Sequence, residues 1–181
     1  MAKAKTKVVP SLKLDLGCGK AKKEGFVGVD CRKFPGVDQV ADLTKPWPWK
    51  SNSVDEVHAS HFLEHLTGMQ RAHFANELYR VLKPGGSKAT IIVPHWLSCR
   101  AYGDVTHQWP PVTEFWPLYL NKAWRDANAP HDDFYTCDFD TTQPGYSLHP
   151  QLRLRSVEHQ QFALTWYREA AQDMILTLVK R

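Results

Sequence analysis

Hydrophobic residues in the first half of the chain gather in five short segments separated by polar residues, glycine and proline. Within residues 11–16 they alternate with polar positions, whereas residues 88–94, KATIIVP, are almost wholly apolar. Alternation is typical of a strand with one buried face, and a short apolar run is typical of a strand buried on both faces. We therefore predict five strands, at residues 11–16, 25–30, 37–43, 53–60 and 88–94.

A different period connects the fourth and fifth of these strands. Between His61 and Leu82 apolar residues recur every three or four positions, with an interruption around Thr67 and Gly68. The KPGG sequence at residues 83–86 then ends the helical pattern and turns the chain. Strands that alternate with helical segments indicate an α/β fold around a mostly parallel sheet.

The second half of the chain is less regular. Residues 96–150 are rich in Trp, Pro, Tyr and Asp, and only residues 112–127 show a helical pattern. Long irregular insertions in compact domains tend to carry function, so we expect this segment to form a cap over a ligand site. Beyond it, residues 152–166 and 172–181 are predicted to be two closing strands, antiparallel because their connection is short. The aromatic residues expected to line a pocket under the cap are Trp96, Tyr102, Trp109, Phe115, Trp116 and Tyr119.

Length and composition narrow the class of protein. The chain has 181 residues, of which 43% are hydrophobic and 23% charged, as in a single globular domain. No apolar run approaches the ~20 residues that span a bilayer, and residues 1–10 form a basic tail without the apolar core of a secretion signal. The four cysteines are widely spaced, which disfavours a zinc knuckle or a disulfide framework and favours a reducing cytoplasm. We expect one domain at residues 11–181 and no membrane association.

A glycine motif, LDLGCGK at residues 14–20, follows the first predicted strand directly. Ligands of parallel sheets bind beyond the carboxyl ends of the strands, and glycine lets the backbone approach them closely. Position 22 is Lys22, so the G-x-G-x-x-G dinucleotide fingerprint is absent, and the chain has no phosphate-binding P-loop sequence. Asp30 and Asp42 end the second and third strands at the same edge, where carboxylates can accept hydrogen bonds from a ribose diol and an adenine amino group.

Five sequence pieces together resemble a known family. LDLGCGK, GVD, ADL, SVDEVHASHFLEHL and ELYRVLKPGGSKATIIVP occur in this order over roughly residues 12–95. They are similar to the motifs of the class I S-adenosylmethionine-dependent methyltransferases, specifically the small methyltransferase type 11 group. The resemblance implies a Rossmann-like, mostly parallel sheet of about seven strands, the last one antiparallel, with helices on both faces. It also implies S-adenosyl-L-methionine as the cofactor.

By this resemblance, particular residues are expected to bind the cofactor. Asp15 and the two glycines would border its methionine part, Asp30 would hold the ribose, and Asp42 would meet the adenine. Residues that follow the fourth strand would close the pocket. The cofactor-binding residues predicted in this way are Asp15, Gly17, Gly19, Asp30, Cys31, Asp42, Leu43, Ser60 and His61.

One departure from the family pattern concerns the first crossover. Only the six residues KAKKEG separate Gly19 from Phe26, whereas a parallel crossover normally takes ~10–12 residues with its helix. We therefore expect the first helix of the family fold to be reduced to about a turn. The lysines of this segment are either solvated or supply the positive charge that the missing helix N-terminus would give.

The HFLEHL sequence offers the candidate chemistry. On a helix His61, Glu64 and His65 share one face, because positions three and four apart are adjacent. The resemblance extends to the E-x-x-E-H pattern with which plant small-RNA and ubiquinone-pathway O-methyltransferases bind a divalent metal. His61 stands where those relatives have their first glutamate, so no metal is predicted. The cluster is either catalytic or a hydrogen-bonded Glu64–His65 pair that braces the helix.

The predicted catalytic residues are His95, Asp104 and His107. His95 ends the fifth strand, and the YGDVTH sequence brings the other two close behind it. An imidazole titrates near neutral pH, so His95 or His107, oriented by Asp104, is expected to remove a proton from the methyl acceptor. The competing hypothesis is a metal ion, held by the HFLEH side chains and a cap residue, that lowers the pKa of the acceptor.

Three functions remain open at this stage. The favoured one is methylation of an oxygen or nitrogen of a small molecule or sugar. RNA or protein methylation is the first alternative, although the net charge of +4 lies mainly in the tail and the KAKKEG segment and does not favour nucleic acid. The second alternative is a non-catalytic module that binds S-adenosylmethionine. DNA amino-methylation is disfavoured, because ASHF stands after the fourth strand in place of [DNS]-P-P-[YFW].

Overall fold

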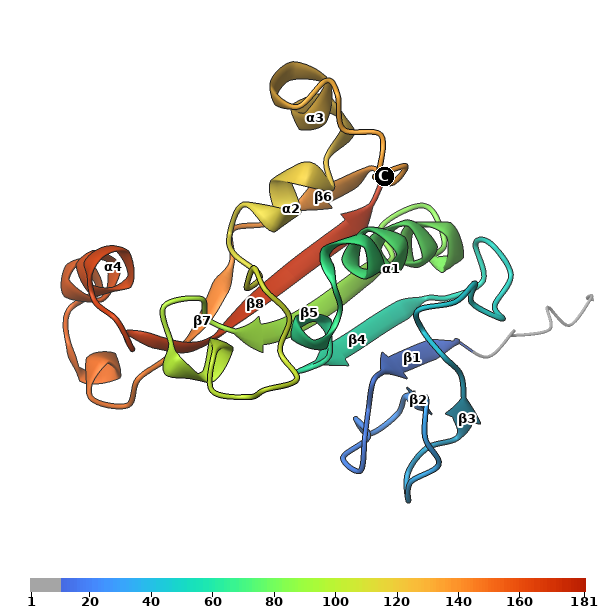
Figure 1. The fold of residues 1–181 in the computed structure, drawn as a ribbon, viewed down its shortest axis with the longest axis horizontal. Helices are drawn as coiled ribbons and strands as arrows, with labels where there is room; N and C mark the ends of the chain where they lie inside the picture. Colours follow the sequence, from blue (N-terminus) through green and yellow to red (C-terminus); the bar gives the residue numbers. More distant parts are fainter. Residues whose placement is uncertain (1–10) are drawn as a thin grey trace, which may run out of the picture.

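An eight-stranded mixed sheet forms the centre of the computed structural model, which describes residues 11–181 (Figure 1). The predicted basic tail lies outside the described residues. The strand order is β3-β2-β1-β4-β5-β8-β6, and β7 also pairs with β8. The Rossmann-like fold class is confirmed. The strands are β1 (Lys13–Leu16), β2 (Val27–Asp30), β3 (Gln39–Val40), β4 (Glu56–Ser60), β5 (Lys88–Pro94), β6 (Phe139–Thr141), β7 (Gly145–Leu148) and β8 (Ala171–Lys180).

The parallel half of the sheet comprises β1 to β5, as the hydrophobic pattern predicts. The chain runs outward from β1 through β2 to β3 and then returns to place β4 on the other side of β1. The strand order thus reverses between β1 and β4, and open α/β sheets bind ligands at such a reversal. Gly17 follows β1 and His61 follows β4, so both lie at this point.

One helix connects β4 and β5. The short 3-10 helix η1 (Leu63–His65) precedes α1 (Gly68–Val81), so the interruption predicted around Thr67 and Gly68 marks the start of α1. Thr67 caps α1 in a reciprocal capping box with Gln70. Helix α1 lies across β4 and β5 in Figure 1 and buries Phe74 and Leu78 completely. The first crossover, residues 17–26, contains no helix, as its length predicts.

The predicted cap at residues 96–150 contains two kinds of structure. Its first part carries the short helices η2 (Cys99–Ala101), α2 (Trp116–Tyr119) and α3 (Lys122–Asn128). The single helix predicted at residues 112–127 is therefore split into two. Residues 139–148 contain β6 and β7, which extend the sheet antiparallel to β8.

The prediction of two closing strands is half wrong. Residues 171–180 form β8, antiparallel to β5 as expected, but residues 152–166 form η3 (Leu152–Leu154) and α4 (Val157–Trp166). The LRLR alternation misled the prediction, because Ser156 follows it and starts a helix by accepting the His159 N–H. Helix α4 lies beyond the β7 end of the sheet (Figure 1). No helix among residues 11–181 is both long and apolar enough to cross a membrane.

Candidate active site

Two cavities lie beside each other at the carboxyl ends of the parallel strands. The nucleoside cavity, as we name the first, has a volume of about 380 Å³, within the range of small-ligand sites. It is lined by Gly17, Asp30, Cys31, Arg32, Ala41, Asp42, Leu43, Thr44, His61, Phe62, His65 and Thr106. The acceptor cavity, the second, has a volume of about 610 Å³. It is lined by His61, Glu64, His65, Pro94, Arg100, Gly103, Asp104, Val105 and His107. His61 and His65 line both cavities, which are therefore adjacent.

Gly17 lets the backbone pass close to the wall of the nucleoside cavity. Its φ is +70°, a conformation that glycine adopts without strain, and its N–H donates to the Val29 carbonyl. A Cβ at this position would lie 2.4 Å from the Phe62 ring. The glycine therefore allows the Phe62 ring to pack directly behind the turn, where it forms part of the cavity wall.

Asp30 lies at the end of β2, and each of its carboxylate oxygens accepts one backbone hydrogen bond. Oδ2 accepts the Gly19 N–H at 3.0 Å, and Oδ1 accepts the Arg32 N–H at 3.0 Å. Each carboxylate oxygen can accept a second hydrogen bond. The loop thus orients Asp30 and leaves it able to receive two hydroxyl groups from a ligand in the cavity.

Asp42 lies on the far wall of the same cavity. Its Oδ1 accepts both the Thr44 N–H, at 2.9 Å, and the Thr44 hydroxyl, at 2.6 Å. These hydrogen bonds from Thr44 hold the pKa of the Asp42 carboxyl below its usual range, so the group is ionised at neutral pH. Leu43, next to it, is buried and gives the cavity an apolar surface.

Three predicted cofactor residues do not line the cavity: Asp15, Gly19 and Ser60. Asp15 is only 3% exposed and lies behind the site. Its Oδ1 is 2.7 Å from Nδ1 of His58, and its Oδ2 accepts the Lys23 N–H at 2.7 Å. Asp15 therefore fastens the short first crossover to β1 and does not line the cavity.

His61 separates the two cavities in a strained conformation. Its φ is +53°, which is uncommon for a residue other than glycine. The turn is held because the His61 N–H donates to the Ile92 carbonyl at 2.9 Å. Nδ1 lies 3.3 Å from Oε1 of Glu64, and this contact raises the pKa of His61 above its usual value, against the opposing effect of burial.

A hydrogen-bonded chain orients His65 in the acceptor cavity. The Thr106 hydroxyl donates to Oδ1 of Asp104 at 2.6 Å, so its oxygen accepts from Nδ1–H of His65 at 2.9 Å. His107 is oriented separately, because its Nδ1–H donates to the Ala101 carbonyl at 3.2 Å. The two imidazole rings meet edge to face with their centroids 4.8 Å apart. In both rings Nε2 is the nitrogen that carries a free lone pair.

The structure does not bring His95 to the acceptor cavity. Its side chain is 1% exposed, and both ring nitrogens have partners: Nε2 contacts Glu114 at 3.2 Å and Nδ1 accepts the Leu97 N–H at 3.3 Å. The neighbouring Pro94 does line the cavity. Successive residues of an extended chain point to opposite faces, so the position after Pro94 is turned away. Of the predicted catalytic residues, Asp104 and His107 are at the cavity.

The cap aromatics do not line the two cavities either. Phe115, Trp116 and Tyr119 surround a separate cavity of about 310 Å³ beside Arg71 and Tyr135. Tyr102 and Trp109 are exposed. The expectation that aromatic side chains would enclose the acceptor is therefore wrong for this structure, and the acceptor cavity is lined mainly by polar residues.

Three side chains that shape the site were missed by the sequence reasoning: Phe62, Arg71 and Thr106. Arg71 is 4% exposed, and its guanidinium donates to the backbone carbonyls of Leu63, Gln108 and Pro110. It thereby fixes the segment that carries His107 against η1. The only local signal for Thr106 was the D-V-T spacing, since a threonine two residues after an aspartate often donates to it.

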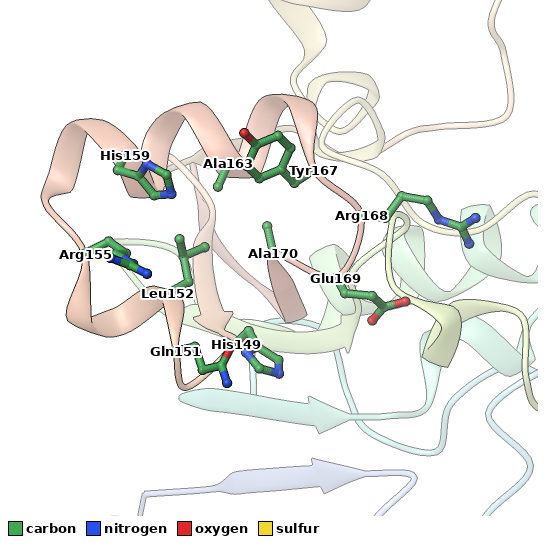
Figure 2. A pocket seen from close by; sticks show the side chains of 10 residues that line it. All are labelled: His149, Gln151, Leu152, Arg155, His159, Ala163, Tyr167, Arg168, Glu169 and Ala170. Carbon is green, nitrogen blue, oxygen red and sulfur yellow. The ribbon is translucent and has the colours of Figure 1, made fainter.

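A further cavity of about 220 Å³ lies beneath α4, away from the sheet edge (Figure 2). Arg155 and His159 lie on one side of it and Arg168 on the other. It shares no residue with the nucleoside or acceptor cavity. Glu169, at its rim, accepts hydrogen bonds from the Ser98 hydroxyl and the Cys99 N–H, so its carboxylate is already engaged.

Comparison with known proteins supports the family resemblance over part of the chain. Residues 19–90 match the family model of the methyltransferase domain. The match covers less than half of the chain. The match agrees with the resemblance to the class I S-adenosylmethionine-dependent methyltransferases and with S-adenosylmethionine as the expected cofactor. No curated protein matches the chain.

Solved structures of methyltransferases share the fold over most of the chain. A SAM-dependent methyltransferase from Archaeoglobus fulgidus is 22% identical, with a TM-score of 0.64 over 94% of this chain and 86% of that one. An S-adenosylmethionine-dependent methyltransferase from Mesorhizobium loti is 14% identical, with a TM-score of 0.57 over 93% and 90%. A third, from Methanosarcina mazei, is 15% identical, with a TM-score of 0.57 over 93% and 91%.

The residues of the nucleoside cavity fit this cofactor. Asp30 offers two oriented carboxylate oxygens to a ribose diol, and the absence of a side chain at Gly17 leaves room beside the backbone. Leu43 and Phe62 supply apolar surfaces for a purine ring, with the ionised Asp42 at their edge.

Proposed function

We propose that the protein transfers a methyl group to an oxygen or nitrogen of a small molecule held in the acceptor cavity. The observation that carries this proposal is that the two cavities are adjacent and share His61 and His65 in their walls. A nucleoside bound by Asp30 and Asp42 would occupy one cavity, beside the two histidines that also line the other. The second cavity, about 610 Å³ and polar, suits a small hydrophilic acceptor.

The chain's own residues orient the acceptor and receive its hydrogen. The cofactor supplies a methyl group on a sulfonium sulfur, which is a good leaving group, so positioning provides a large part of the rate. His65 and His107 present Nε2 lone pairs to the cavity, because their Nδ1–H groups are held by Thr106 and Ala101. A hydroxyl or amine of the acceptor donates its hydrogen to this pair. Asp104 acts through Thr106 to hold the tautomer of His65.

The cofactor half of the proposal is tested by the Asp30→Ala variant. Loss of the hydrogen bonds from a ribose diol to a carboxylate should weaken binding of S-adenosylhomocysteine about 10- to 100-fold in calorimetry. Asp38→Ala is the matched control. Asp38 accepts the Gly28 N–H at 2.8 Å and pairs with Lys22, so it stabilises the same loops, but it lines no cavity.

The two variants separate cofactor binding from loop stability. Asp38→Ala should lower stability and change the affinity by less than about threefold. Equal losses of affinity in both variants would mean that Asp30 acts only through the loop. The acceptor half is tested with radiolabelled cofactor and a panel of hydroxyl and amine metabolites, with RNA and peptides as the competing classes; labelling of RNA or peptide alone would overturn the small-molecule assignment.

A further inference from the structure

We propose that Glu64, His65 and His107 bind one divalent transition-metal ion at the boundary of the two cavities. One ligand atom from each residue lies within 4.8 Å of the other two. Ligand atoms 2.0–2.2 Å from a tetrahedral ion are about 3.3–3.6 Å apart. Small side-chain rotations close this difference, and the two imidazole rings already meet edge to face.

The strongest sign that a cation binds here is a buried oxygen of the Glu64 carboxylate, unpaired within the described part of the chain. Glu64 is 4% exposed, and its Oε1 is engaged by Nδ1 of His61 at 3.3 Å. Its Oε2 is buried and has no hydrogen-bond partner among residues 11–181. An unpaired oxygen of a buried carboxylate is costly. A cation beside Oε2 would remove that cost, and Glu64 lines the cavity in which such an ion would sit.

The two imidazoles are arranged as metal-bound histidines usually are. Metal-ligating histidines donate their other ring N–H to a carboxylate, a carbonyl or a similar group, which fixes the tautomer. Nδ1–H of His107 donates to the Ala101 carbonyl, and Nδ1–H of His65 donates to the Thr106 oxygen, which is backed by Asp104. Both Nε2 atoms are left to face an ion.

The backbone holds the two ligand-bearing segments together. The N–H of Gln108, directly after His107, donates to the carbonyl of Glu64 at 2.8 Å. The Arg71 guanidinium reinforces the same junction from behind. The ligands therefore come from rigidly joined segments even though about 40 residues separate them in the chain.

The ligand set indicates the class of ion. Two imidazole nitrogens and one carboxylate oxygen suit Zn²⁺, Mn²⁺, Fe²⁺ or Co²⁺, whereas Mg²⁺ and Ca²⁺ prefer oxygen ligands. The sequence alone predicted no metal, because His61 replaces a glutamate. In the structure His61 lies outside the ligand set and orients Glu64 instead.

Three protein ligands leave at least one coordination position open, as in catalytic rather than structural sites. That position faces the acceptor cavity, where an ion would lower the pKa of an acceptor hydroxyl or amine. With the ion bound, the Nε2 atoms would be ligands and would no longer receive the acceptor's hydrogen, so the proton of the acidified group would pass to solvent water. This catalytic consequence rests on the proposed function, but binding of the ion does not.

The experiment uses the full chain stripped of metal with a chelator. Calorimetry with Zn²⁺ and the visible absorption of added Co²⁺ should show one ion per chain. Glu64→Gln, His65→Ala and His107→Ala should each weaken Zn²⁺ binding at least 100-fold, and Thr106→Val about tenfold, as for loss of an outer hydrogen bond. His159→Ala, which removes an exposed histidine on α4, should leave the affinity unchanged.

Three results would each overturn the proposal. The first is the absence of Co²⁺ absorption in the folded wild type. The second is Zn²⁺ binding that persists in both Glu64→Gln and His107→Ala, and the third is Zn²⁺ binding that is lost in His159→Ala. Far-UV circular dichroism and urea midpoints establish that the near-isosteric Glu64→Gln variant is folded. Calorimetry of the metal-free wild type with S-adenosylhomocysteine separates the two proposals, because failure there contradicts the proposed function and leaves the metal site intact.

Discussion

Replacement of Gly17 by alanine should destabilise the protein far more than the same change at Gly19, although both glycines belong to one motif. The two residues share a left-handed backbone, with φ of +70° and +53°. An alanine in this conformation costs about 1–2 kcal/mol relative to glycine. The difference comes from the surroundings. A Cβ at position 17 would lie 2.4, 2.5 and 2.8 Å from three atoms of Phe62, whereas a Cβ at position 19 meets no atom within 4 Å.

The clash at Gly17 can be relieved only by moving the Phe62 ring, which packs against Phe74 in the core. Overpacking of this kind typically costs about 1–3 kcal/mol. We therefore expect Gly17→Ala to lower the free energy of unfolding by about 2–5 kcal/mol, and Gly19→Ala by about 1–2 kcal/mol. Urea unfolding measures both, with an unchanged slope and a lower midpoint. Equal midpoint shifts, or a larger one for Gly19→Ala, would refute the packing argument.

Two further predictions concern the groups that hold the acceptor cavity together. Arg71→Met removes three hydrogen bonds to backbone carbonyls and should lower the free energy of unfolding by about 2–4 kcal/mol, with faster amide exchange at Gln108. Arg71→Lys keeps the charge but not the planar guanidinium that reaches three separate carbonyls, so it should recover only part of the loss. The Glu64 contact raises the pKa of His61, so this pair stabilises the fold fully below the usual value near 6.5 and loses its effect as pH rises through the folded pKa. The difference in unfolding free energy between wild type and His61→Gln should therefore shrink from pH 5.5 to pH 8.5, and a difference independent of pH would contradict the assignment.

The parallel half of the fold was predictable because its signals are local. Residues 88–94 carry their burial in an unbroken apolar run, and the KPGG turn marks the end of α1 without reference to any other part of the chain. β6 and β7 lack such a signal. They have only three and four residues and are held by pairing with β8, which follows some 30 residues later. In short strands of this kind, the partner rather than the segment itself decides the structure.

The contrast between local sequence signals and contacts to distant segments also separates the site residues that were predicted from those that were missed. Asp30 and Asp42 were found because the end of a parallel strand is a position that the pattern reveals. Thr106 acquires its role from His65, 41 residues earlier, through a contact with no periodicity in the sequence. His95 was misplaced for a different reason. Its position at a strand end was right, but a change of one residue in the alternation turns a side chain to the opposite face.

The first crossover, residues 17–26, contains no helix, so its backbone N–H groups lack helical hydrogen bonds. Aspartate carboxylates accept some of these N–H groups instead. Asp15 accepts the Lys23 N–H and Asp30 accepts the Gly19 N–H, while Asp38 accepts the Gly28 N–H of the adjoining strand β2. Two of these acids lie outside the nucleoside cavity and only stabilise the loops. Asp30 would have both roles under the proposed function, because the carboxylate that holds the glycine turn also lines the nucleoside cavity. A bound ribose diol would therefore reinforce the turn that orients its own acceptor, so cofactor binding and the order of the first crossover are coupled through this one side chain.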